Sequence, residues 1–158
     1  MSHIFDAMDL KQPKKVALKF LARREYSKKE LHQQLQKKGF TQEQIDLVLK
    51  FLSEKGWQSD ERFTECYIRS RIRAGFGPIR IALELTQKGV EEHVFEKHLK
   101  SNDEPFWMQQ ITCVFLKRFK QAAQNRAQYL KQCQFLQNRG FAQYRIIQVL
   151  KGDDYEYE

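Results

Sequence analysis

Residues 35–49 read LQKKGFTQEQIDLVL, and this stretch returns in two further versions along the chain. The second is LTQKGVEEHVFEKHL at residues 85–99, and the third is LQNRGFAQYRIIQVL at residues 136–150. Each copy has a Leu four residues before a Gly and large apolar residues six and ten positions after that Gly. The copies lie 50 and 51 residues apart, and self-similarity at a fixed period of this length is typical of repeat proteins. We therefore expect function on an extended surface shared by repeats, rather than in one enclosed pocket.

The composition favours helices in all of the repeats. The chain has 158 residues with only three Pro and seven Gly, and 41% of its residues are hydrophobic, which is enough for a folded core. Lys, Glu, Gln, Leu and Arg are abundant, and all five are good helix formers. We predict an all-α fold of nine helices, arranged as three tandem three-helix repeats in an elongated, curved array. The expected segments are a lead-in (1–13), repeat 1 (14–57), repeat 2 (58–101), repeat 3 (102–151) and an acidic tail (152–158).

Local signals place helix boundaries in repeat 1. A first helix is expected over residues 14–24, after Pro13. Two capping boxes, Ser27 with Glu30 and Thr41 with Gln44, predict the starts of the second and third helices. The glycine of the repeated stretch is expected just beyond the end of the second helix, in a left-handed conformation that penalises side chains.

Repeat 2 is expected to open with a long helix over residues 59–74. We predict an inner apolar stripe formed by Phe63, Cys66 and Tyr67. Ile68 and Ile72 lie four residues apart and away from that stripe, so they need a second neighbour, which is either the adjacent repeat or a partner protein. Other aromatic residues at repeat positions, such as Trp57, are expected in the core, whereas Phe76 and Tyr144 are candidates for exposure. In repeat 3 we expect an inner face of Tyr129, Leu130, Cys133 and Leu136.

The net charge is +8, and Asp153, Asp154, Glu156 and Glu158 at the end of the chain carry four of the negative charges, so the rest carries +12. A basic body attracts phosphate backbones or acidic protein surfaces, although basic charge also serves solubility. The three cysteines are far apart and odd in number, which favours buried thiols in a reducing compartment. With no apolar run long enough to span a membrane and no signal-peptide pattern, we expect a cytoplasmic protein.

No catalytic constellation is apparent. His93 and His98 are five residues apart, which does not stack them on one helix face as a metal-binding pair requires. No H-E-x-x-H, C-x-x-C, Walker A or G-x-S-x-G motif occurs. We therefore predict no enzymatic activity, no cofactor and no metal site.

The basic residues are the strongest functional signal in the residues themselves. Arg62, Arg69 and Arg73 recur at nearly the same angle on the predicted helix, and Arg80 extends this stripe. A row of Arg can pair bidentately with phosphates or carboxylates, but a solvated helix edge explains a charge run equally well. The candidate partner- or DNA-binding residues are Arg62, Arg69, Arg73, Arg80, Lys88, Lys117, Arg118, Arg126 and Arg139.

Several motifs, in this order, resemble the RecX family of recombination regulators. They are Tyr26-Ser27-x-x-Glu30-Leu31-x-x-x-Leu35-x-x-x-Gly39-Phe40, then Asp60-Glu61-Arg62-Phe63-x-x-x-Tyr67, Arg69-Ser70-Arg71 leading to Gly75-x-Gly77-Pro78, Leu85-Thr86-Gln87-Lys88-Gly89-Val90, and Arg139-Gly140-Phe141. The resemblance spans residues 14–151. Cys66 stands where the family usually has Ala, and the Gln-rich stretch from residue 109 to 137 makes repeat 3 the weakest match.

The resemblance implies a small cytoplasmic protein, expected to be monomeric, that binds the RecA recombinase and its filament on single-stranded DNA. It implies inhibition of strand exchange, ATP hydrolysis and co-protease activity without catalysis. The residues themselves leave two alternatives: a helical nucleic-acid-binding protein, because three-helix units resemble helix-turn-helix modules, or a repeat adaptor without a recombinase partner.

Overall fold

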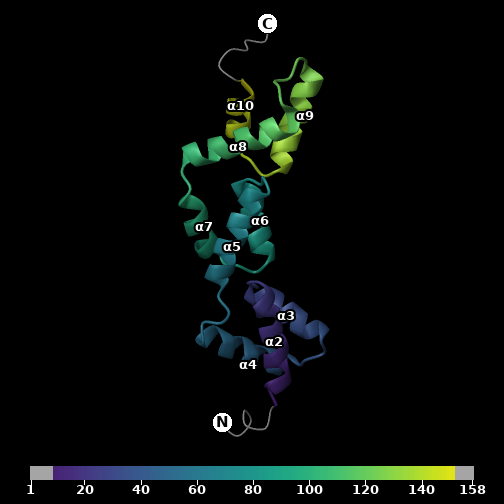
Figure 1. Cartoon of the computed structure of the whole chain (residues 1–158), viewed down its shortest axis with the longest axis vertical. Coiled ribbons are helices and arrows are strands. Elements are labelled where there is room, and N and C mark those ends of the chain that lie inside the picture. The colour runs from purple at the N-terminus through teal and green to yellow at the C-terminus, as the bar shows by residue number, and fades with distance from the viewer. Residues whose placement is uncertain (1–8, 152–158) are drawn as a thin grey trace.

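A computed structural model describes residues 9–151, which form nine helices grouped in threes. The first three are α2 (Lys11–Arg23), α3 (Lys28–Lys37) and α4 (Gln42–Glu54). The next three are α5 (Asp60–Arg73), α6 (Pro78–Gln87) and α7 (Glu92–Lys100). The last three are α8 (Glu104–Phe119), α9 (Arg126–Asn138) and α10 (Gln143–Lys151). Figure 1 shows the three groups following one another along the long axis of the molecule.

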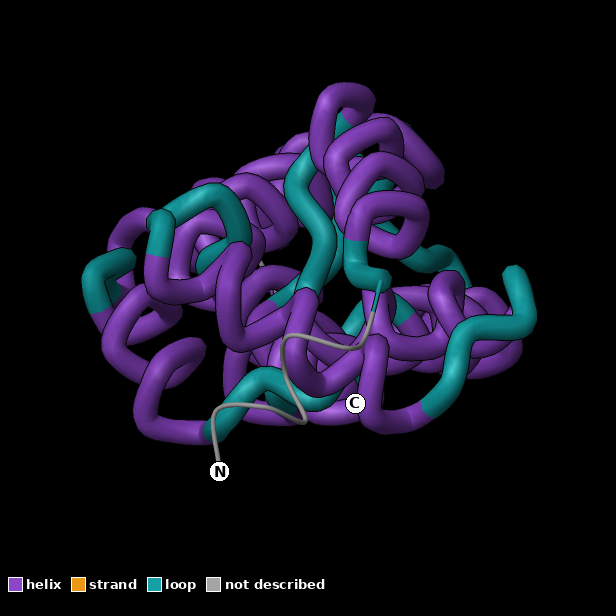
Figure 2. Tube along the Cα trace, turned by 90° about the horizontal axis from the view of Figure 1, so that it is seen from below, coloured by secondary structure: helices purple, strands orange, loops and turns teal. Residues whose placement is uncertain are grey.

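The predicted all-α repeat fold is confirmed. Within residues 9–151 every element is a helix or a loop, with no strand (Figure 2). Each helix packs on the other two of its own repeat: α2, α3 and α4 on one another, then α5, α6 and α7, then α8, α9 and α10. The tandem arrangement produces the elongated array visible in Figure 1.

The repeated Leu-x-x-x-Gly spacing is explained by the way in which the middle helix of each repeat ends. In repeat 1 the N–H of Phe40 donates to the carbonyl of Leu35 (3.3 Å), and the N–H of Gly39 donates to that of Gln36 (2.9 Å). These are the two hydrogen bonds of a Schellman motif, in which the glycine is left-handed and the apolar residues on either side of it meet. The same pair of bonds ends α6 and α9, so the sequence repeat is a repeated helix stop.

The helix starts follow the predicted caps, with one correction. Both capping boxes form: the Ser27 hydroxyl accepts from the N–H of Glu30 (3.1 Å), and the Thr41 hydroxyl accepts from the N–H of Gln44 (3.2 Å). The expected lead-in of residues 1–13 is too long, because α2 begins at Lys11 and holds a buried Pro13 in its first turn. Proline is tolerated there because the first N–H groups of a helix have no partner within it. The predicted acidic tail lies outside the described residues.

The array contains two separate hydrophobic cores. The first belongs to repeat 1 and contains Leu31, Leu35, Ile45 and Leu52, all fully buried. The second is shared by repeats 2 and 3 and runs from Phe63 on α5 to Leu150 on α10. Repeats 2 and 3 therefore form one packed body, and repeat 1 joins them mainly through polar contacts.

The predicted inner stripe of α5 is partly wrong. Phe63 is buried, but Tyr67 is half-buried and Cys66 is exposed, whereas Thr64 and Ile68 are buried. At about 100° per residue, Cys66 lies roughly 130° from the midpoint between Phe63 and Ile68, and so it faces solvent. Ile72 packs against the core that repeats 2 and 3 share, which places the adjacent repeat beside it.

Four further burial predictions are corrected. Trp57, 48% exposed, lies beyond the end of α4 and makes an edge-to-face contact with Phe51 (ring centroids 5.7 Å apart). Leu130 on α9 is also exposed, because the face that packs on α8 and α10 carries Gln132 and Leu136. The thiols are not buried: those of Cys66 and Cys113 are exposed and that of Cys133 is half-buried. Phe76 is half-buried rather than exposed, whereas Tyr144 is exposed as predicted.

Candidate functional site

The junction between repeats 1 and 2 is built around the carboxylate of Glu30. It accepts from the N–H of Ser27 (3.1 Å), from Arg24 (3.1 Å) and from the ammonium of Lys88 on repeat 2 (2.8 Å). Burial opposes the charged form of this carboxyl, but the hydrogen bonds from Lys88, Arg24 and Ser27 outweigh it, and the pKa of Glu30 is lowered. The Ser27 hydroxyl also donates to the carbonyl of Lys88 (2.8 Å). Lys88, a candidate binding residue, thus has its ammonium paired within the protein, although its side chain is 31% exposed.

Arg62 contributes to the same junction. Its guanidinium donates to Glu25 (3.0 Å) and to the carbonyl of Gly56 (2.7 Å), both in repeat 1 or at its end. Arg62 begins the predicted basic stripe on α5, yet its donors are engaged within the chain. The pair with Glu25 is about half exposed on the arginine side, so it leaves one edge of the guanidinium in contact with solvent.

The junction between repeats 2 and 3 is a backbone clasp. The N–H groups of Gly77 and Ile79, at the start of α6, donate to the carbonyls of Arg139 (2.7 Å) and Gly140 (3.0 Å). Side chains reinforce the clasp, because Arg80 donates to the carbonyl of Asn138 (3.0 Å) and Arg139 donates to that of Ala74 (3.0 Å). Arg80 and Arg139, both candidate binding residues, thereby join the two repeats.

Phe76 lies at the centre of this clasp, among three guanidinium groups. The carbon atoms of the Arg71, Arg80 and Arg139 guanidinium groups are 3.8, 4.4 and 4.6 Å from its ring centroid. Stacking of this kind pairs a cation with the negative face of the ring. The Phe76 ring therefore holds the three guanidinium groups close together in one cluster of positive charge.

Glu84 balances part of that charge. Its carboxylate accepts from Arg71 (2.6 Å), from Arg80 (3.0 Å) and from the hydroxyl of Tyr67. Burial raises the pKa of Glu84, but these three donors outweigh it and the net pKa is lowered. Burial and the neighbouring carboxylate raise the pKa of Tyr67. Arg71, Phe76 and Glu84 were not among the predicted binding residues; the i,i+4 spacing of Arg80 and Glu84 was the available signal for the last.

A second group of the predicted residues remains available to a partner. Arg69, Arg73, Lys117 and Arg126 are exposed, and within the described part of the chain their side chains form no hydrogen bond or ion pair. Arg118 is also exposed, and its guanidinium carbon lies 5.5 and 5.8 Å from the ring centroids of Phe119 and Phe135. The fold does not need these charges for its own packing.

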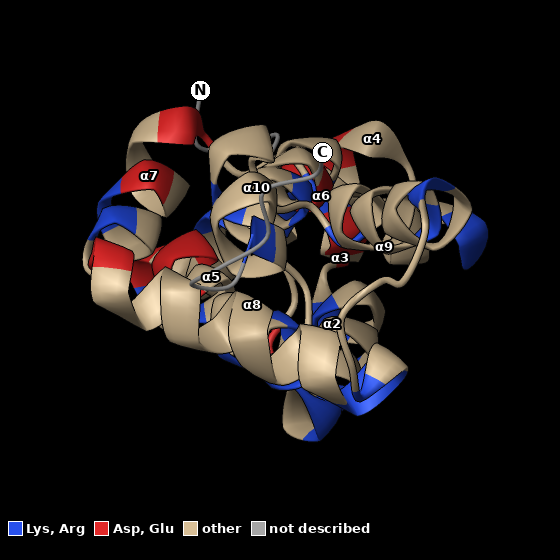
Figure 3. Cartoon of the chain, turned by 90° about the horizontal axis from the view of Figure 1, so that it is seen from above, with Lys and Arg blue, Asp and Glu red and all other residues tan. Residues whose placement is uncertain are grey.

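The structure brings four of the predicted residues to one place. Arg73, Lys117, Arg118 and Arg139 line a cleft of about 250 Å³ between α5, α8 and α9, which we call the basic cleft. No acidic side chain from residues 9–151 lines it. Figure 3 shows Lys and Arg on α8 and, at the other end of the array (Figure 1), on α2, and it shows acidic residues on α5 and α7.

The remaining predicted residues are distributed around the basic cleft. Arg69 lies one helical turn before Arg73, and these two also line a neighbouring cleft of about 480 Å³. Arg126 begins α9, and Arg62 and Lys88 belong to the other junction. The arrangement suits ligands that carry several negative charges along an extended surface, such as a phosphate backbone or an acidic protein face.

Sequence comparison identifies the family. The model of the first three-helix domain of RecX matches residues 14–52, and the model of its second three-helix domain matches residues 59–99. A Regulatory protein RecX from Halorhodospira halophila is 41% identical over 126 residues, which cover 79% of this chain and 78% of that protein. The chain belongs to the RecX family. A RecX from Legionella pneumophila is 37% identical over 136 residues (85% of this chain, 90% of that protein).

Solved structures agree with this RecX fold. The crystal structure of RecX from Lactobacillus salivarius superposes with a TM-score of 0.76, covering 90% of this chain and 94% of that one at 20% identity. A second crystal structure of a regulatory protein RecX superposes with a TM-score of 0.78, covering 91% of this chain and 72% of that one, also at 20% identity. At this identity the likeness concerns the fold alone.

The RecX-family repeats include no membrane-spanning element among the described residues. None of the helices between residues 9 and 151 combines the length and the apolar character needed to cross a bilayer.

Proposed function

We propose that this RecX-family protein binds the RecA recombinase filament on single-stranded DNA and inhibits its recombinase, ATPase and co-protease activities. In this role it modulates DNA repair and the SOS response in the cytoplasm. It acts as a monomer and by binding alone, not as an enzyme. Family membership is the observation that carries the proposal, because the relatives are named regulatory proteins.

The unused positive charge supports this proposal at the level of residues. A folded protein gains nothing in packing from Arg69, Arg73, Lys117 or Arg118, since none of them pairs with an acidic group in the described chain. They lie on α5 and α8, on both sides of the junction between repeats 2 and 3. We assign to these four the contacts with DNA phosphate or with acidic residues of the recombinase.

The shape of the molecule supports a groove-binding mechanism. An elongated array of three repeats (Figure 1) suits the groove of a helical nucleoprotein filament, and its available cations lie where repeats 2 and 3 meet. The backbone clasp between Gly77, Ile79 and repeat 3 keeps α5 and α8 in fixed relation, so the cations on both helices are positioned before binding. An array seated in this way bridges neighbouring recombinase protomers or caps the growing end.

The first test is the single-strand-DNA-dependent ATPase of RecA with this protein titrated in. We expect suppression. Suppression well below one copy per recombinase protomer would indicate end capping, and suppression only near equal stoichiometry would indicate groove binding. Full ATPase activity at all ratios, with the protein folded, would refute the proposed function.

Charge reversal tests the proposed surface. The double variant Arg69→Glu with Arg73→Glu should lose inhibition, because it places two carboxylates beside the basic cleft. The matched control is Lys37→Glu with Lys50→Glu, which makes the same change in net charge at exposed residues of repeat 1. Inhibition left intact by the first pair, or lost equally with both pairs, would remove Arg69 and Arg73 from the binding surface.

A second candidate function is direct nucleic-acid binding without a recombinase. The absence of acidic residues from the basic cleft favours phosphate as one of its ligands. The discriminating measurement is binding of this protein to single-stranded DNA alone. Tight, saturable binding that accounts for the whole ATPase effect by competition would favour this second function.

A further inference from the structure

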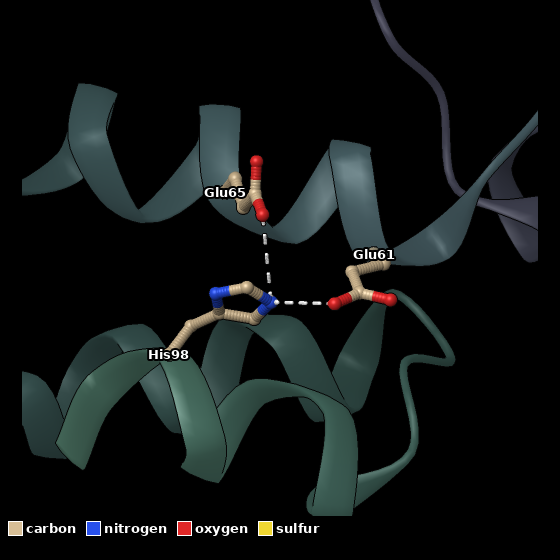
Figure 4. A group of neighbouring side chains, drawn as sticks. All are labelled: Glu61, Glu65 and His98. Atoms are coloured by element: carbon tan, nitrogen blue, oxygen red, sulfur yellow. Dashed lines mark ion pairs between the residues drawn. The ribbon is translucent and has the colours of Figure 1, made fainter. Parts of the chain in front are cut away.

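Three potential metal ligands meet between α5 and α7, outside the basic cleft. Glu61 and Glu65 lie one turn apart on α5, and His98 lies near the end of α7, which packs on α5. Figure 4 shows the two carboxylates and the imidazole ring turned toward one another. The sequence analysis predicted no metal site because no two histidines share a helix face; this cluster depends on packing between helices.

The distances are those of ligands around a small cation. The Nε2 atom of His98 is 3.5 Å from Oε1 of Glu61 and 3.9 Å from Oε1 of Glu65. All three ligand atoms lie within 4.8 Å of one another. Zinc bonds of about 2.0–2.1 Å in tetrahedral geometry separate neighbouring ligand atoms by roughly 3.4 Å. Small side-chain rotations therefore suffice to bring the three atoms onto one ion.

The Nε2 atom of His98 faces the carboxylates of Glu61 and Glu65 but makes no hydrogen bond. The side chain of His98 is 18% exposed, and the Nε2 atom itself is buried from solvent. A buried nitrogen that leaves its hydrogen-bonding capacity unused is destabilising, and buried polar atoms in native proteins almost always have a partner. The Nε2 atom points to the space between the two carboxylates, where a cation would satisfy it.

The charge around the cluster also favours a cation. Glu61 and Glu65 are like charges at i,i+4, a spacing that destabilises a helix. The ammonium of Lys97 lies 3.2 Å from Oε1 of Glu61. Both members of that ion pair are more than half exposed, and exposed pairs contribute little.

We propose that Glu61, Glu65 and His98 form a Zn²⁺-binding site. The imidazole nitrogen favours zinc over Mg²⁺ and Ca²⁺, which take oxygen ligands. Two carboxylates neutralise the ion, and three protein ligands leave one coordination position for water or for a group of a partner. The bound ion links α5 to α7 within repeat 2, because two of its ligands lie on α5 and one lies on α7. It also adds positive charge beside Arg69 and Arg73, because Glu65 and His98 line the same cleft of about 480 Å³ as those two residues.

The experiment is a zinc titration of the purified full chain, freed of metal with a chelator, against a chromophoric zinc indicator at pH 7.5. We expect one equivalent to bind and the melting temperature to rise with zinc. The variants His98→Gln and Glu65→Gln should bind at least about tenfold more weakly, because each removes one of three ligands. His93→Gln is the matched control: it lies on the same helix, its side chain is 77% exposed, and it should bind as tightly as the unaltered protein.

Two further measurements separate this site from binding elsewhere. Cys66 is an exposed thiol next to Glu65, so Cys66→Ser must retain the site, and Co²⁺ in place of zinc must show tetrahedral bands without a thiolate charge-transfer band. Lys97→Ala frees Oε1 of Glu61 and should bind zinc at least as tightly. Equal affinity in the unaltered protein and the folded His98→Gln variant, or loss of binding in Cys66→Ser, would overturn the proposal. These readouts need no recombinase, so they are independent of the proposed function.

Discussion

Replacing Gly140 by Ala should destabilise the protein far more than the same change at Gly39, although the two glycines are equivalent in the sequence repeat. Both are left-handed, with φ of +93° and +89°. A Cβ at Gly39 would meet nothing within 4 Å. A Cβ at Gly140 would lie 2.3 Å from Cβ of Arg80 and 2.5 Å from its backbone nitrogen. Because that contact is with the backbone of α6, the neighbour is unable to rotate away.

The magnitudes follow from these contacts. The left-handed conformation costs Ala about 1–2 kcal/mol, partly offset by the lower chain entropy of unfolded Ala, which leaves about 1 kcal/mol for Gly39→Ala. At Gly140 the clash also separates α6 from repeat 3. This breaks the hydrogen bonds that the N–H groups of Gly77 and Ile79 and the guanidinium of Arg80 donate across the junction. At about 1 kcal/mol each, their loss brings the cost of Gly140→Ala to about 4 kcal/mol.

The assay is urea unfolding followed by far-ultraviolet circular dichroism, combined with amide hydrogen exchange. Gly140→Ala should speed exchange at the amides of Gly77 and Ile79, and Gly39→Ala should leave both unchanged. The reasoning is refuted if the two variants differ by less than about 0.5 kcal/mol, which is the usual scatter for independent sites. It is also refuted if the amides of Gly77 and Ile79 keep their protection in Gly140→Ala.

Two further predictions concern charge. Glu30→Gln should lower the free energy of unfolding at pH 7 by about 2 kcal/mol, because charge-assisted hydrogen bonds from Lys88 and Arg24 are lost. The folded-state pKa of Glu30 is lowered, so its contribution is fully present above the ordinary pKa and is lost as the pH falls through the lowered folded-state pKa. Urea unfolding should show a smaller difference between the variant and the unaltered protein at pH 3 than at pH 7, and an equal difference at both pH values would contradict this. If the basic cleft binds phosphates of single-stranded DNA, replacing both Arg73 and Lys117 by Ala should make the slope of log affinity against log salt concentration less steep by about 1.4. Fluorescence-anisotropy titrations measure this slope, and an unchanged slope would show that neither side chain contacts phosphate.

Local features of the fold were predictable because they depend on residues close together in the chain. A capping box needs only two residues three positions apart, and both predicted boxes form, at Ser27 and at Thr41. The helix stop at each repeated glycine likewise needs only the residues from four before it to one after it. The start of α2 was misplaced because Pro13 is compatible with either a loop or a first helical turn.

The candidate binding surface was only partly predictable. Charge and helical periodicity indicate that Arg69 and Arg73 share a helix face, but they do not indicate which neighbours compete for each guanidinium. Arg62 and Arg80 have the same spacing signal, yet both are engaged in contacts between repeats. Lys117 and Arg118 join Arg73 at one cleft only because α8 packs beside α5.

The sequence by itself determined the all-α class, the period of the repeats, the capped helix starts and the left-handed glycine that ends each middle helix, since all of these depend on interactions within a few residues. Tertiary structure alone decided what each repeated glycine meets: open space at Gly39, the side chain of Lys29 at Gly89 and the backbone of Arg80 at Gly140. It also decided the meeting of His98 with the glutamates of α5. The physical reason is the same for the glycines and for His98. Which surfaces touch depends on how whole helices pack, and identical local motifs can therefore have different neighbours.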